Sequence, residues 1–120
     1  MDETTIDVLF VVVNNSLGRR GTGTLQESAS WGWKQGANPA PRADFVVAVY
    51  ERQVQHPEFS VLDQWVDDHR RRRFELAETS VLSDHFGSAG LQNLKGRMYF
   101  ALKLVHVAVP TSVLEGSPVA

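Results

Sequence analysis

The sequence contains no cysteine, which excludes disulfide bridges, thiolate metal sites and cysteine nucleophiles. It also lacks an excess of either charge: 12 lysines and arginines stand against 14 aspartates and glutamates, for a net charge of −2 at pH 7. No overall positive field therefore attracts the chain to nucleic acid or anionic lipid. The longest apolar run, Val8 to Val13, is far shorter than the roughly 18 residues of a membrane-spanning helix. The start, Met1-Asp2-Glu3, lacks the basic residues of a secretory signal peptide, so we expect synthesis and folding in a cytoplasm.

The composition is that of a globular domain. The 120 residues are 42% hydrophobic and 22% charged, close to the averages of about 45–50% and about 25% for such domains. Chains rarely divide below about 150 residues, so we expect a single domain over residues 1–120.

Four segments have the character of β-strands. Residues 6–13 and 45–50 consist largely of β-branched and aromatic side chains. Residues 24–33 alternate loosely between apolar and polar side chains, and we expect them to pair back on the first strand across a glycine-rich tip at 18–23. The longest predicted strand, residues 98–109, has apolar side chains on both faces and ends at a proline.

A helix is predicted over about residues 61–77. Ser60 is a suitable N-cap, and Asp63 three residues later complements the helix dipole. Two aspartates, at positions 67 and 68, each stand four residues before an arginine, in the order that stabilises helices. The helix could continue to about Phe86, or residues 74–82 could form a separate strand. Residues 88–96 are predicted as a loop, and residues 111–120 as a tail without a further element.

The predicted fold is therefore a β-rich α+β domain. A mostly antiparallel sheet, sandwich or partial barrel carries one main helix, residues 61–77.

The run Arg70 to Arg73 has two interpretations. Acidic neighbours at positions 67, 68 and 75 neutralise most of its charge, which favours a solvated or subunit-contacting surface. The alternative is a contact with phosphate or nucleic acid. Because the net charge is −2, nucleic acid is not expected to be a specific ligand.

The sequence shows no pattern typical of a metal site or a catalytic site. The histidines have none of the spacings common in zinc sites; they are His56, His69, His85 and His106. His106 lies in an apolar strand and is interpreted as a core or interface residue. There is no glycine-flanked nucleophile elbow and no phosphate-binding glycine loop before a helix. We therefore expect no metal, no cofactor and no enzymatic activity.

Trp31 and Trp33 lie two residues apart and would share one face of a strand. Such a pair could form an aromatic platform for a sugar or a base. Tryptophan is enriched at interfaces between subunits, and we favour that interpretation.

The order of predicted elements over residues 45–118 resembles that of a known family. The strand 45–50 is followed by a helix of the form Leu62-Asp-Gln-Trp65-Val66, a basic stretch and a long strand that closes in Val107-Ala-Val-Pro110-Thr. This order resembles the tail-tube family of contractile injection systems, found in contractile-tailed phages and related bacterial particles. The resemblance implies a closed or nearly closed β-sandwich whose sheet edges pair between subunits in a six-membered ring.

The sequence therefore predicts a non-enzymatic structural subunit of a phage-like tail or contractile injection particle: a tube, tail or baseplate component that assembles through its sheet edges. Its partners would be copies of itself and other particle proteins. It would reside in the bacterial cytoplasm during assembly and then in the virion or injection particle. The candidate subunit-interface residues are Trp31, Trp33, Arg71, Arg72, Tyr99 and Lys103. The alternative prediction is a small-ligand-binding domain with a pocket between helix and sheet, lined by Trp65, Tyr99 and His106.

Overall fold

The structure is a computed structural model that describes residues 2–13, 33–34, 42–66, 68, 71–100 and 102–115. It is a mixed α+β fold dominated by strands, as predicted. The strands are β1 (Glu3–Val12), β2 (Trp33–Lys34), β3 (Phe45–Tyr50), β4 (Gln53–Val54), β5 (Glu58–Val66), β6 (Arg71–Thr79) and β7 (Leu102–Pro110). The helices are α3 (Val81–Lys95) and α4 (Thr111–Glu115), and no described helix is long and apolar enough to cross a bilayer.

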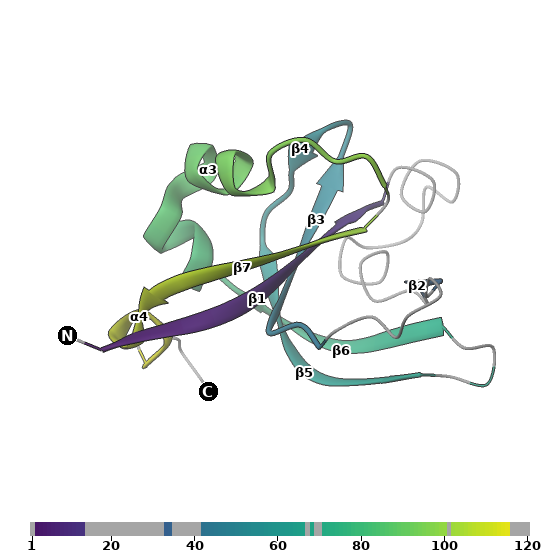
Figure 1. Cartoon of the computed structure of the whole chain (residues 1–120), viewed down its shortest axis with the longest axis horizontal. Helices are drawn as coiled ribbons and strands as arrows, with labels where there is room; N and C mark the ends of the chain where they lie inside the picture. Colours follow the sequence, from purple (N-terminus) through teal and green to yellow (C-terminus); the bar gives the residue numbers. More distant parts are fainter. Residues whose placement is uncertain are drawn as a thin grey trace.

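All the described strands belong to one sheet, in the order β2-β6-β5-β3-β1-β7, with β4 paired to β3 (Figure 1). Only β1 and β3 are parallel, and the other pairs are antiparallel. The predominance of antiparallel pairs confirms the prediction. The sheet does not close into a barrel, in contrast to the closed or nearly closed sandwich that the family resemblance implies.

The predicted strand 45–50 is confirmed as β3, and the predicted strand 6–13 is confirmed as β1, which begins earlier, at Glu3, and ends at Val12. Most of the predicted strand 24–33, and all of the glycine-rich tip 18–23, lie outside the described residues. At its described end, Trp33 belongs to β2 and pairs with β6, whereas the neighbours of β1 are β3 and β7.

The helix predicted over residues 61–77 is wrong. This segment forms the antiparallel hairpin of β5 and β6, with a register shift between Val61 and Asp63. Phe74 and Leu76 are buried two residues apart, which is strand periodicity. Each charge pair at i,i+4 stabilises a helix by only about 0.2–0.5 kcal/mol, whereas burying one large apolar side chain contributes about 1.5–3 kcal/mol. Burial in the sheet therefore outweighs local helix preference.

The main helix lies further along the chain, in α3, which includes most of the predicted loop 88–96. Glycines and serines in that segment suggested the loop. Gly87 does interrupt the helical backbone, with φ 74° and ψ 169°, but the helix resumes after it. Leu82 and Leu91, on either side of the interruption, are both fully buried against the sheet, and this packing keeps the two halves of α3 in place.

The C-terminal part also differs in detail from the prediction. The last strand begins at Leu102 rather than residue 98, and α4 follows it where only a tail was expected. The chain start and α4 lie side by side, because Thr111 N–H donates to Asp2 O at 3.1 Å and the Thr4 and Thr111 hydroxyls are 2.8 Å apart (Figure 1).

The core lies on both faces of the central pair β1 and β3. On one face Val8 and Phe10 pack with side chains of α3, and on the other Leu9 and Val11 pack in a second cluster with Phe59 and residues of β6. Because both faces are covered, these two strands are almost continuously apolar.

A buried carboxylate attaches the start of α3 to β5. Glu58 has no exposed surface, and its Oε1 accepts hydrogen bonds from Ser83 N–H at 3.0 Å and from the Ser83 hydroxyl at 2.9 Å. Ser83 lies in the first turn of α3, where backbone N–H groups need acceptors from outside the helix. Glu58 therefore acts as an N-terminal cap supplied by a neighbouring strand.

Gly87→Ala is expected to destabilise the protein by about 1–3 kcal/mol, because the backbone region of Gly87 is accessible almost only to glycine. An added Cβ would meet no atom within 4 Å, so the cost is one of backbone conformation rather than of space. Urea unfolding of the variant measures it. Asn93→Ala, at an exposed position of the same helix, is the control and should leave stability unchanged or slightly higher. Equal stability of Gly87→Ala and the unmodified protein would contradict the assigned backbone.

Candidate functional site

The outer edge of β7 is an open row of backbone hydrogen-bonding groups. In an antiparallel ladder, residues that bond to the neighbouring strand alternate with residues whose N–H and C=O point away from it. The bond from Thr111 N–H to Asp2 O, one position beyond the pair Glu3–Pro110, sets this alternation for β1 and β7. The β7 residues that point away from β1 are then Leu102, Leu104, His106, Ala108 and Pro110.

Two further observations support this assignment. Pro110 has no N–H, and in the assigned alternation the residue at its position does not donate a hydrogen bond to β1. Asp7, which stands opposite His106, directs its own N–H and C=O away from β7 to Asp44. Within the described part of the chain, no strand pairs with this edge of β7. Among the described residues, the outward N–H and C=O groups of β7 therefore have no strand partner.

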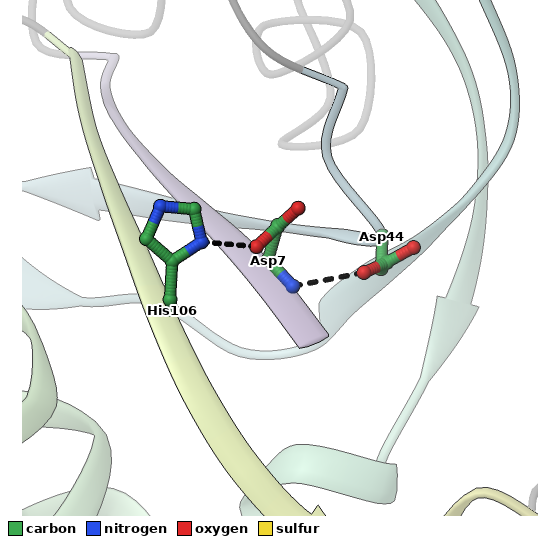
Figure 2. Close-up of polar contacts among 3 residues, drawn as sticks. All are labelled: Asp7, Asp44 and His106. Carbon is green, nitrogen blue, oxygen red and sulfur yellow. Dashed lines mark hydrogen bonds and ion pairs between the residues drawn. The ribbon is translucent and has the colours of Figure 1, made fainter. Parts of the chain in front are cut away.

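A polar cluster of Asp7, Asp44 and His106 lies beside this edge (Figure 2). His106 Nδ1 bonds to Asp7 Oδ1 across the β1–β7 pair. On the other side of β1, Asp7 N–H donates to Asp44 Oδ2 at 2.8 Å, and Asp44 N–H donates to Asp7 O at 2.8 Å. The His106 side chain is 64% exposed, so it is not the core histidine that the sequence suggested as one possibility.

The contacts of this cluster connect neighbouring strands. The Asp7–His106 contact joins β7 to β1, and the Asp44 carboxylate binds a backbone N–H at the start of the β1–β3 pair. Within the residues that the structure describes, no group of three or more histidines and carboxylates is arranged to hold a metal ion.

A second histidine, His56, contacts a hydroxyl. His56 Nε2 and Ser88 Oγ are 3.0 Å apart, and both residues are exposed. A serine nucleophile normally requires an imidazole base that a third group orients. In the described part of the chain, no carboxylate bonds to the His56 ring. The contact links the residues before β5 to α3.

The predicted interface residues are distributed over several parts of the fold. Trp31 lies outside the described residues, and for Trp33, Arg71 and Arg72 the structure describes the backbone, in β2 and β6. Tyr99 stands just before β7 and is 80% exposed, as an interface residue of a free subunit would be. Lys103 is half-buried, and its ammonium donates to Lys95 O at 2.6 Å and to Arg97 O at 3.1 Å.

Lys103 thus stabilises the C-terminal end of α3, where carbonyl oxygens lack helical partners and a cation is favourable. Lys103→Met is expected to lower the free energy of unfolding by about 1–2 kcal/mol, because it removes two charge-assisted hydrogen bonds. Urea unfolding at low protein concentration tests this, with Lys103→Arg as the variant that keeps the charge. Unchanged stability together with weaker self-association would instead assign Lys103 to a subunit interface.

The alternative pocket of Trp65, Tyr99 and His106 is not assembled. Trp65 is on β5, which β3 and β1 separate from the strand of His106. His106 lies on the face of Leu102 and Leu104, whereas its neighbours Val105 and Val107 pack on the face that α3 covers.

A different hollow, of 710 Å³, lies beside the end of α3. Its lining comes from the ends of β1 and β3, the turn after β3 and the segment after α3. The lining residues are Val12, Val49, Arg52, Lys95, Gly96, Arg97, Met98, Tyr99 and Phe100. Of these, only Tyr99 was singled out from the sequence. The others are far apart in the chain, and no spacing pattern indicated that they would meet.

No protein-family model, no curated protein and no solved structure matches this chain.

Proposed function

We propose that this protein is a non-enzymatic structural subunit that assembles with copies of itself through the outer edge of β7. The observation that carries the proposal is the row of backbone groups that points away from β1 along this strand. Exposed strand edges are sites of pairing with other chains unless charges, prolines or covering segments protect them. In the part of the chain that the structure describes, no segment covers this edge, and its one proline, Pro110, stands at the end of the strand.

The side chains of β7 favour the same conclusion. Most of its residues are neither fully buried nor fully exposed, although six of its nine residues are valine, leucine or alanine. Apolar side chains that stay partly in water gain from burial against a partner.

The proposed setting is a phage-like tail or contractile injection particle, which the sequence resemblance implies. The strands of that resemblance correspond to β3 and β7. The segment Leu62–Val66, which the resemblance treats as a helix, is part of β5. Self-assembly through β7 is therefore the primary proposal, and the particle is the secondary one.

The measured mass of the assembly tests the proposal and also its geometry. Pairing of β7 with β7 of a second copy gives a closed two-fold dimer, whereas pairing with a different surface of the next copy gives a ring. Mass photometry and sedimentation velocity over a range of concentrations should show a discrete oligomer, and electron micrographs should show rings if the contact is of the second kind. A strict monomer at high micromolar concentration would overturn the proposal.

A further inference from the structure

The hollow beside the end of α3 has the dimensions of a small-molecule site, since such sites enclose about 300–1,000 Å³. Its floor contains Val12 and Val49, which stand opposite each other on β1 and β3. One wall is the turn after β3, and the other is the segment that follows α3.

Gln92 holds the two walls together. Its Oε1 accepts a hydrogen bond from Val54 N–H at 2.7 Å, and its Nε2 contacts Arg52 O at 3.4 Å and Gln53 Oε1 at 3.3 Å. The turn that carries Arg52 is thereby fixed against α3. The hollow is consequently preformed by the fold.

Among the described residues that line the hollow, the charged ones are all positive: Arg52, Lys95 and Arg97. Within the described part of the chain, none of the three forms an ion pair with a carboxylate. This concentration of positive charge is local, because the whole chain has a net charge of −2.

Lys95 is the most informative of the three. The residue is only 8% exposed, and within the described ranges its ammonium has one hydrogen-bond acceptor, Gly96 O at 3.1 Å. The last carbonyl of α3, Lys95 O, is bonded by Lys103 Nζ, which also bonds to Arg97 O beyond the helix. Among the described residues, the Lys95 ammonium therefore has one acceptor for its three N–H groups, and an anionic ligand in the hollow would supply further acceptors.

The remaining lining is aromatic and apolar. Tyr99 and Phe100 lie at the rim, and each is 80% exposed. Met98, which precedes them in the chain, also lines the hollow and is half-buried. Aromatic side chains provide flat surfaces on which planar rings stack. From these observations we infer that the hollow binds a small organic anion with a planar ring, its phosphate or carboxylate group held by Arg52, Lys95 and Arg97 and its ring against Tyr99 and Phe100.

Equilibrium dialysis of the full chain against phenyl phosphate tests this inference, with inorganic phosphate and phenol as the two separate halves of the probe. We expect saturable binding of phenyl phosphate that is tighter than that of either half. Benzoate, tested alongside, identifies whether phosphate or carboxylate is preferred. Arg52→Gln combined with Arg97→Gln, both at exposed positions, should weaken binding about tenfold or more.

Two controls separate the contributions of charge and ring. Arg42→Gln makes the same change outside the hollow and should leave binding unchanged. Tyr99→Ser combined with Phe100→Ser should reduce the affinity for phenyl phosphate to that for inorganic phosphate, and circular dichroism verifies that the variants are folded. Absence of saturable binding of both phenyl phosphate and benzoate would overturn the inference, as would undiminished binding by the folded Arg52, Arg97 variant. Neither result would bear on self-assembly through β7.

Discussion

Ala108→Pro is expected to convert the assembled protein into folded monomers. The N–H of Ala108 points away from β1, so proline at this position removes a donor from the open edge without removing a bond to β1. The partner's acceptor would be left unpaired at a cost of about 1–3 kcal/mol, and the proline ring would also obstruct close approach of a strand. The dissociation constant should therefore rise at least about tenfold, as sedimentation velocity would show.

Two matched variants make this result specific to the edge. Ala108→Ser keeps the backbone N–H at the same exposed position and should assemble like the unmodified protein. Val107→Pro removes an N–H that bonds to β1 and should lower stability itself, which circular dichroism and urea unfolding would detect. If Ala108→Pro remained folded and still formed the original oligomer, β7 would not be the contact edge.

Glu58→Ala is expected to lower the free energy of unfolding by about 3 kcal/mol. The carboxyl group is fully buried and accepts two hydrogen bonds from Ser83, and each buried donor that loses its acceptor costs about 1–3 kcal/mol. Its removal leaves the Ser83 N–H without that acceptor at the start of α3. Because small domains are stable by only about 5–15 kcal/mol, the loss should be obvious in urea unfolding.

Ser83→Ala is the matched control for Glu58→Ala. It removes the hydroxyl bond at 2.9 Å but keeps the backbone N–H bond at 3.0 Å, so its cost should be smaller, about 1 kcal/mol. If Glu58→Ala cost no more than Ser83→Ala, the backbone bond of the strand-supplied cap would contribute little. The attachment of α3 would then depend on other contacts, chiefly the burial of Leu82 and Leu91 and the hydrogen bonds of Gln92.

Predictions from the sequence succeeded where one local signal dominated. The strand 45–50 was predicted with its observed bounds, because its β-branched and aromatic residues are buried on both faces. The β-rich α+β class followed from the same kind of segment. The helix 61–77 failed because its local signals, a cap and charge pairs, are weak, whereas Phe59, Phe74 and Leu76 are buried through contacts distant in sequence.

The turn after β3 and the start of α3 also needed the tertiary structure. Glu51 and Arg52 both have positive φ, the conformation of a two-residue hairpin turn, although neither residue type favours it. The pairing of β3 with β4 and β5 on one edge imposes that turn. Likewise, Ser83 gains an acceptor from Glu58, 25 residues earlier, which no local pattern indicates.

The sequence by itself determined that this is a β-rich domain without disulfides and that its last long strand is apolar up to a proline, because composition and alternation are local properties. Only the tertiary structure decided that this strand forms an outer edge, because that depends on which strands lie beside it. The register with β1 then decides which N–H groups of β7 point outward. The cationic hollow has the same origin. Arg52 and Lys95 line one cavity because the sheet order and the contacts of Gln92 bring the β3 turn to the end of α3.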